Sequence, residues 1–271
     1  MFYITILIIG TAAFVLFVLL PAPMTLFCVV GAVSLFILLA WFSLSIFVVQ
    51  VPFVYRAKIR GDKSRPRVAL TFDDGPHPKF TPMVLDILKN HNFKATFFLV
   101  GEKVLAEPET VKRMVDEGHG IGNHSMSHVH LLSLMRTKKQ MEEIQECSRA
   151  IADTAGISIA TSTAPRWYRP PMGYKTPSTF LAAKRLGLAV VGWHIKGWDT
   201  FYTDSERIAS SILERVKNGS MVLLHDSSTL KGGAADRSPT VDALPVILSG
   251  LKDMGLEPVT LDELFDTGGT K

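Results

Sequence analysis

Hydrophobic residues follow one another without a charged side chain over the first 55 positions of the chain. The first Lys, Arg, Asp or Glu is Arg56, so all 29 basic and 25 acidic residues come after Tyr55. As a helix, residues 2 to 20 would measure about 28 Å at about 1.5 Å per residue, enough to cross a bilayer core of about 30 Å. Pro21-Ala22-Pro23 breaks this helix, and residues 25 to 49 form a second apolar run that can span with tilt. The pattern predicts two transmembrane helices arranged as a hairpin.

These two apolar runs fit neither a cleavable signal peptide nor a buried core helix. A signal peptide would have a basic amino-terminal region and would not be followed by a second long span. A buried core helix is excluded by the length of both runs and by their lack of charge. A single anchor, with residues 2 to 20 lying differently, stays open. We therefore expect residues 1–55 to be a membrane anchor and the protein to be a multi-pass protein of the plasma membrane.

A basic segment follows the anchor. Residues 56–66 carry several basic side chains against a single acidic one, Asp62, and Arg67 extends the excess; the basic residues are Arg56, Lys58, Arg60, Lys63 and Arg65. The positive-inside rule places such a juxtamembrane linker, and with it both chain ends, in the cytoplasm. The same segment could also bind anionic lipid head groups at the membrane surface.

Beyond residue 66 the apolar pattern changes to short segments that alternate between strand and helix. We expect strands at 67–73, 94–100, 119–123, 188–195, 220–225 and 257–260, and helices at 81–90, 109–117, 136–152, 177–186, 204–217 and 240–254. Residues 156–168 are expected to be irregular. The stretch 67–271 is long enough for one domain with its own core. Strand and helix alternation favours a parallel α/β architecture.

Two motifs in this domain suggest a metal site. The strand before Asp73-Asp74-Gly75-Pro76 ends abruptly, and successive residues there point in different directions. One carboxylate can therefore bind a metal while its neighbour faces the bound water. His124 and His128 are spaced i, i+4, which would put both rings on one face of a helical turn, about 6 Å apart. One carboxylate and two imidazoles leave coordination positions open for water and substrate, as metal-assisted hydrolysis requires.

Each motif has a plainer interpretation when it is taken alone. Asp-Asp-Gly-Pro is typical of a turn, and a His pair at this spacing is more often a solvated helix face. Together the two motifs point to a divalent metal. Zinc is the default for this ligand set, although cobalt, nickel and manganese also suit it.

Charge and cysteine content exclude some classes of function. The net charge of +4 and the pI near 9.0 could suggest nucleic-acid binding. Much of the excess lies in the juxtamembrane linker, however, and no nucleic-acid motif accompanies it. Cys28 lies in an apolar span and Cys147 in an expected helix, so a disulfide between them is implausible. We expect no nucleic-acid partner and no cofactor other than the metal.

The motifs also resemble a known family. Thr71-Phe72-Asp73-Asp74-Gly75-Pro76 and His124-Ser125-Met126-Ser127-His128 are similar to the first two motifs of polysaccharide deacetylases, the NodB-homology or carbohydrate esterase family 4 group. Arg169-Pro170-Pro171-Met172-Gly173 resembles the third motif and Leu223-Leu224-His225-Asp226 the fifth. The resemblance runs in order from about residue 67 to about residue 264. It implies a distorted (β/α) barrel, and a catalytic domain over residues 67–271.

The resemblance assigns a role to each matching residue. Asp73 matches the general base and His225 the general acid, while Arg169 matches the arginine that orients the base. The metal ligands would be Asp74, His124 and His128. The backbone N–H around Met172 corresponds to the group that helps hold the oxyanion.

The fourth motif departs from the family pattern. Asp199 keeps the second acid of the motif, Thr200 stands where a tryptophan is expected, and Lys196 replaces the first acid, which tunes the catalytic histidine. A cation near His225 would lower its pKa. Either Asp199 or Asp226 therefore supports the histidine, or the histidine works differently.

The third motif departs as well, because Met172 replaces an aromatic residue that is common after its prolines. Stacking against the sugar would then come from Tyr174, Trp193 or Trp198, although packing in the core explains these aromatics equally well. Pro171 and Gly173 complete the set of expected substrate-binding residues.

The resemblance implies a metal-dependent hydrolase of carbon–nitrogen bonds other than peptide bonds. It would remove acetyl from an N-acetylated amino sugar in a polysaccharide, in peptidoglycan or in a lipid-linked saccharide. A non-catalytic, metal-containing saccharide-binding relative is the alternative, although binding alone needs neither Asp73 nor His225. Deformylation or O-deacetylation of a lipid-linked sugar is the rival reaction. A cytoplasmic domain would favour a lipid-linked precursor, whereas enzymes of the family usually modify wall polymers outside the membrane.

Overall fold

The computed structural model describes residues 22–47, 57–156, 165–228 and 236–266. The chain divides into two compact units, Met1–Ile46 and Phe47–Lys271, which we describe separately.

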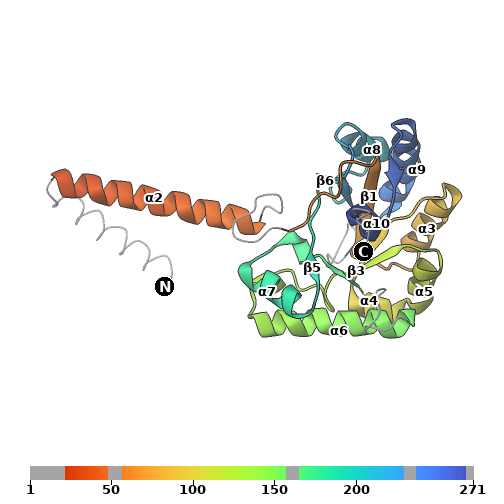
Figure 1. The fold of residues 1–271 in the computed structure, drawn as a ribbon, viewed down its shortest axis with the longest axis horizontal. Coiled ribbons are helices and arrows are strands. Elements are labelled where there is room, and N and C mark those ends of the chain that lie inside the picture. Colours follow the sequence, from red (N-terminus) through yellow and green to blue (C-terminus); the bar gives the residue numbers. More distant parts are fainter. Residues whose placement is uncertain (1–21, 48–56, 157–164, 229–235, 267–271) are drawn as a thin grey trace. The chain divides into compact units, whose positions relative to one another are not determined.

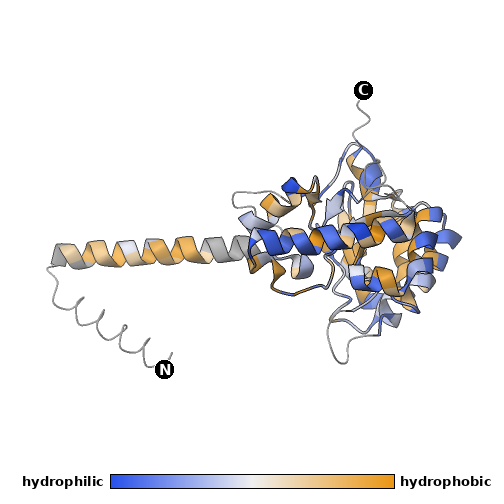
Figure 2. Ribbon diagram, turned by 90° about the horizontal axis from the view of Figure 1, so that it is seen from below, coloured by the Kyte–Doolittle hydropathy of each residue, from blue (hydrophilic) through white to orange (hydrophobic). Residues whose placement is uncertain are grey.

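Helix α2 (Ala22–Phe47) is the described element of the first unit, and its 26 residues carry no charge. Figure 2 shows its apolar character along the helix. Its side chains are described only at residue 24 and from 26 to 40, where the large apolar ones are between 41% (Val29) and 80% (Phe27) exposed. When only the described residues are counted, no helix is both long and apolar enough to cross a membrane. The first expected span, at residues 2 to 20, lies outside the described residues.

The second unit is built on a parallel sheet (Figure 1). Its strands follow the order β5-β4-β3-β2-β1-β7-β6, and β8 pairs with the start of β1. The strands are β1 (Arg67–Asp73), β2 (Thr96–Leu99), β3 (Gly120–Asn123), β4 (Trp167–Tyr168), β5 (Ala189–Val190), β6 (Ile195–Lys196), β7 (Met221–His225) and β8 (Glu257–Pro258). The predicted parallel α/β architecture is confirmed.

Helices follow most strands. They are α3 (Phe80–Asn90), α4 (Gly101–Ala106), α5 (Pro108–Asp116), α6 (Thr137–Ala155), α7 (Pro177–Arg185), α8 (Ser205–Leu213), α9 (Ser238–Asp253) and α10 (Leu261–Phe265), with short 3-10 turns η1 (Leu132–Leu134) and η2 (Pro171–Gly173). The expected longer helices are present within a few residues of their predicted ends. The short helices α4 and α10 are not predicted by the sequence, because one or two turns carry too little periodicity to be recognised.

The strand expected at 188–195 is wrong. Residues 189–190 form β5, which pairs with β4, whereas residues 195–196 form β6, which pairs with β7 at the other edge of the sheet. Between them the chain crosses from one edge to the other, and Gly192 donates its N–H to the carbonyl of Lys58. An apolar run does not reveal which neighbour each part of it pairs with. Strand β4 also lies within the stretch that was expected to be irregular.

The juxtamembrane linker is tied to the sheet. Lys58 forms a bridge with Val191, and Arg60 forms one with Ser220. The ammonium of Lys58 also lies 4.5 Å from the ring centroid of Phe265. These basic residues are therefore part of the folded second unit.

Side chains of β1 alternate between two apolar layers. Val68, Leu70 and Phe72 pack with the helices in the largest core cluster, whereas Ala69 packs with Phe98, Trp167 and Met221 inside the curl of the sheet. Because successive residues of a strand face opposite sides, Thr71 and Asp73 lie on the inner face. The carboxyl end of this face holds the candidate site.

Candidate active site

The predicted site residues converge at the carboxyl ends of neighbouring strands. Asp73 and His225 are paired in the register of β1 and β7. Asn123, which precedes His124, is paired with Tyr168, which precedes Arg169. Parallel register thus brings four motifs that are far apart in the chain to the carboxyl end of the sheet.

Three buried side chains form a candidate metal centre. The Oδ1 atom of Asp74 lies 3.4 Å from Nε2 of His124 and 3.2 Å from Nε2 of His128. The three ligand atoms all lie within 4.8 Å of one another. The Nδ1–H of His124 donates to the backbone carbonyl of Arg169 at 2.7 Å, which leaves the Nε2 lone pair facing the carboxylate. Lone pairs that face one another in a buried site need a cation between them, so this donor set fits a divalent metal.

The backbone of the second motif differs from its prediction. Residues 124–128 form an irregular bend and not a helical turn. Ser125 and His128 have positive φ angles of 69° and 50°, so the bend, and not helical periodicity, brings the two rings to a centroid distance of 4.9 Å. Left-handed backbone at non-glycine residues is strained, and such strain tends to gather at functional sites.

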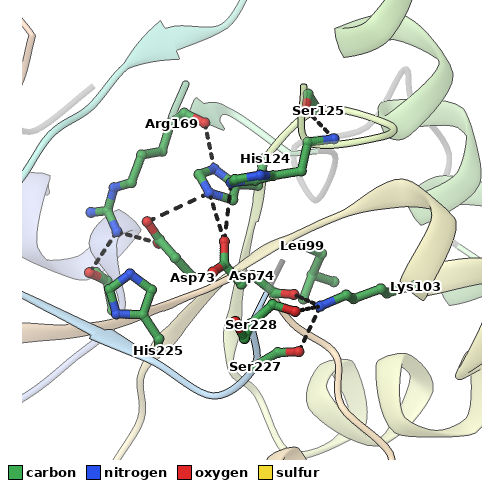
Figure 3. A network of polar contacts seen from close by, with 12 residues as sticks. Asp73, Asp74, Leu99, Lys103, His124, Ser125, Arg169, His225, Ser227 and Ser228 are labelled. Atoms are coloured by element: carbon green, nitrogen blue, oxygen red, sulfur yellow. Dashed lines mark hydrogen bonds and ion pairs between the residues drawn. The ribbon is translucent and has the colours of Figure 1, made fainter. Parts of the chain in front are cut away.

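Lys103 holds the backbone of the first motif in place. Its ammonium donates to the backbone carbonyl of Asp74 at 2.7 Å, to Oγ of Ser227 at 2.7 Å and to the carbonyl of Ser228 at 3.0 Å (Figure 3). Asp74 itself has a φ of 74°. Burial lowers the pKa of Lys103, and the Asp74 and Asp226 carboxylates oppose that shift. No motif pointed to this lysine, because it joins the ends of β1 and β7 from helix α4.

Asp73 is held by the predicted arginine. NH1 of Arg169 donates to Oδ1 of Asp73 at 2.6 Å and to Oγ1 of Thr71 at 2.9 Å, and NH2 donates to the Gly192 carbonyl at 2.7 Å. Arg169 is fully buried, with its guanidinium 4.1 Å from the ring centroid of Phe98. Such an ion pair fixes the orientation of the Asp73 carboxylate. Oδ2 of Asp73 lies 3.8 Å from Nε2 of His124, so the second oxygen faces the metal centre.

His225 is supported by Asp199. The Nδ1 atom of His225 lies 2.9 Å from Oδ1 of Asp199, and its backbone N–H donates to Oδ2 at 2.6 Å. Thr240 also donates to Oδ2, and Arg237 donates to the Asp199 carbonyl at 3.2 Å. Burial disfavours the charged imidazole, but the Asp199 carboxylate, together with the smaller effects of Asp74 and Asp73, outweighs burial and raises the pKa of His225. Thr240 and Arg237 were not predicted, because they lie about 40 residues beyond Asp199 along the chain.

The structure decides between the two open alternatives for the fourth motif. Asp226 does not support His225, because its Oδ2 accepts from Thr81 at 2.5 Å, and burial raises its pKa to about 6. Lys196 turns its ammonium toward Trp198 and Phe201, with ring centroids at 4.8 and 5.0 Å. Lys196 is not among the groups that shift the pKa of His225, and the alternative in which Asp199 supports the histidine agrees with the contacts.

The expected substrate-binding residues divide by exposure. Met172 and Trp198 are exposed by 44% and 39%, and Met172 has a φ of 58° within η2. Pro171 and Gly173 are buried and form the turn that carries Met172, while Tyr174 and Trp193 are partly buried. The guanidinium of Arg169 lies 5.9 Å from the ring centroid of Trp193, which places that indole beside the buried ion pair.

Comparison with known proteins agrees with the geometry. A family model described as polysaccharide deacetylase matches residues 60–191. The peptidoglycan-N-acetylglucosamine deacetylase of Bacillus cereus is 38% identical over 200 residues, which cover 73% of this chain and 87% of that protein. The chitooligosaccharide deacetylase of Bradyrhizobium sp. is 38% identical over 210 residues, 75% of this chain and 93% of that one.

A solved structure is similar as well. It is a peptidoglycan N-acetylglucosamine deacetylase in complex with 4-naphthalen-1-yl-N-oxidanyl-benzamide, with a TM-score of 0.69 and 35% identity over 78% of this chain and 93% of that chain. The chain belongs to the polysaccharide deacetylase family. Its sheet is the curled, open α/β half-barrel of the NodB type, and it is a hydrolase that acts on the N-acetyl group of sugars.

Proposed function

We propose that the chain is a metal-dependent N-deacetylase of amino sugars in peptidoglycan or in a lipid-linked saccharide. The observation that carries this proposal is that Asp73, the candidate metal ligands and His225 lie together at the carboxyl end of the sheet. The names of the relatives, which specify peptidoglycan and chitooligosaccharides, support N-acetylglucosamine as the sugar.

The residues of the site divide the work of amide hydrolysis. A divalent cation held by Asp74, His124 and His128 would supply Lewis acidity toward the acetyl carbonyl and lower the pKa of a nearby water. Asp73, oriented by Arg169, is placed to accept the proton of the attacking water. His225, whose protonated form the Asp199 carboxylate favours, is placed to donate a proton to the departing amine nitrogen. Zinc is the first choice for the ligand set, before cobalt, nickel and manganese.

Acetate release tests the reaction. The full chain, loaded with metal, is expected to release acetate from N-acetylglucosamine oligomers. Asp73→Asn should lose about 10²- to 10⁴-fold in turnover, the usual contribution of a positioned base, while metal content stays near normal. His124→Ala should lose the metal.

Three results would redirect the proposal. Parallel loss of metal in both variants would contradict the separate roles of Asp73 and His124. Release of formate, or of acetate from O-acetylated sugars alone, would identify one of the rival reactions. A metal-loaded protein that binds saccharides but releases no acetate from any of them would be the non-catalytic relative.

We also propose that residues 1–55 anchor the catalytic unit to the plasma membrane as a transmembrane hairpin. Support comes from the absence of any charge before Arg56 and from the exposed apolar side chains of α2. The basic residues that follow favour a cytoplasmic catalytic unit, and hence a lipid-linked saccharide as substrate. A reporter fused after Lys271 should then be active in the cytoplasm. Reporter activity only outside the membrane would reverse the orientation and assign the enzyme to an external polymer.

A further inference from the structure

Lys196 lies on the inner face of the sheet, close to the catalytic residues in register. In β6 it pairs with Leu223 of β7, which in turn pairs with Thr71 of β1. Paired residues of parallel strands point to the same face, so Lys196 belongs to the layer directly below Asp73 and His225. Strand β6 is an edge strand of the sheet.

The ammonium of Lys196 faces aromatic rings and not an acid. It lies 4.8 Å from the ring centroid of Trp198 and 5.0 Å from that of Phe201. Across the described ranges, this ammonium forms no ion pair with a carboxylate. The charge of Asp199, which is hydrogen bonded to His225, acts on Lys196 from further away and opposes the lowering of its pKa by burial. A lysine ammonium has three donors, and aromatic faces leave them unused. The side chain is only partly buried, so an outside acceptor can reach it.

The two rings are presented to solvent by an unusual backbone. Trp198 is 39% exposed and Phe201 is 69% exposed, with their ring centroids 5.8 Å apart. Trp198 has a φ of 60°, and its carbonyl accepts from the backbone N–H groups of Phe201 and Tyr202 at 2.9 Å. A bulky residue at positive φ is strained, and core packing does not explain the strain because both rings are exposed.

Open space adjoins this group. Phe201, at one side of the cluster, and Asp199 line a pocket of about 510 Å³ that also includes Arg237 and the carboxylates of Asp236 and Asp242. A sugar stacked on the exposed rings would therefore lie beside the residue that supports His225. Adjacent aromatic side chains that are exposed to solvent are typical of a binding surface.

We propose that Lys196, Trp198 and Phe201, here called the cationic–aromatic cluster, form a subsite for a sugar that carries an anionic group, a carboxylate or a phosphate, next to the N-acetylated sugar that is hydrolysed. The rings hold the sugar and the ammonium pairs with its anion. This inference rests on the proposed deacetylase function and names the substrate class of that site. It also gives the lysine that replaces the family's acid a role in substrate selection.

Matched substrates test the subsite. Full-length, metal-loaded protein is assayed for acetate release from three oligosaccharides of equal length, which carry a neutral, a carboxylated or a phosphorylated sugar beside the N-acetylglucosamine. We expect a higher kcat/KM for at least one anionic substrate, expressed mainly in KM and reduced by added salt. Lys196→Gln should lower the ratio of anionic to neutral kcat/KM by about tenfold, the order of a charge-assisted hydrogen bond. Lys196→Arg should keep the preference, and the surface control Lys252→Gln should not change the ratio.

The carboxylated and phosphorylated substrates distinguish the two sources of the anion. A ratio that stays the same in Lys196→Gln, or a wild-type protein without anionic preference, would overturn the inference. If no substrate releases acetate, the proposed function fails, and the subsite is judged by binding alone. Calorimetry on the Asp73→Asn protein would then show tighter binding of the anionic oligosaccharides, lost in Asp73→Asn/Lys196→Gln; equal binding in the two proteins would reject the subsite.

Discussion

Replacing Asp199 by Asn would test the acid side of the mechanism. The carboxylate accepts both Nδ1–H and the backbone N–H of His225, at 2.9 and 2.6 Å, and its side chain is fully buried. A hydrogen bond to a charged group contributes about 1.5–3 kcal/mol to the charged form. At 1.36 kcal/mol per tenfold, removing the carboxylate charge lowers the protonated fraction of His225 about 10- to 100-fold once pH exceeds its pKa.

The pH dependence of kcat/KM for acetate release measures this change. Because a general acid must be protonated, activity falls as pH rises through the pKa of His225, which Asp199 raises above its ordinary value. In Asp199→Asn the basic limb of the pH profile should move to lower pH. At pH values above the pKa of His225 in the wild type, kcat/KM of the variant should be about 10- to 100-fold lower than that of the wild type. Thr240→Val removes only a neutral donor to Asp199, so its limb should move much less. An unmoved limb in Asp199→Asn would refute the assignment of His225 as the acid.

Two further predictions concern the buried charges around the metal centre. Lys103→Met removes the donor to the Asp74 carbonyl and should weaken metal binding about 10- to 100-fold, measured by competition with a chelator. The control Lys94→Met removes a hydrogen bond to the Glu117 carbonyl, away from the site, and should leave metal affinity unchanged. Asp226 has a pKa raised to about 6, so the native state binds its proton more tightly than the unfolded state, and this contribution to stability is lost as pH rises from about 4 to about 6. The Asp226→Asn variant does not lose this contribution. In metal-free protein, its unfolding free energy minus that of the wild type should therefore increase by up to about 3 kcal/mol as pH rises through this window. A difference that stays constant between pH 4.5 and 7.5 would contradict the raised pKa.

The chemistry of the site could be predicted because its components are local in sequence. Asp73 and Asp74 are adjacent and His124 and His128 lie four residues apart, so a short motif contains each pair. Burying an ionisable side chain without a partner costs free energy, so Asp and His residues next to a buried strand indicate a functional site. The expected helical turn at 124–128 was nevertheless wrong, because left-handed φ angles at Ser125 and His128 produce the same convergence of rings by another route.

Supporting contacts could not be predicted, because they join residues that sequence separates. Lys103 comes from α4 and holds β1 to the end of β7, while Thr240 at the start of α9 holds Asp199. Their partners are fixed by how the helices pack on the sheet, and periodicity carries no information about such pairing.

By itself, the sequence predicted a candidate ligand set, a candidate base and a candidate acid, which the structure brings together, and it predicted the parallel α/β order of the domain. Residue type and short spacing suffice for these predictions. Only the tertiary structure decided that Asp199 supports His225 and that Lys196 faces Trp198 and Phe201. The physical reason lies in the sheet: residues 189–190 and 195–196, one apolar run in the sequence, pair with opposite edges. That division places the segment of Lys196 and Asp199 beside β7, so that Asp199 accepts hydrogen bonds from His225 while the ammonium of Lys196 faces two exposed rings.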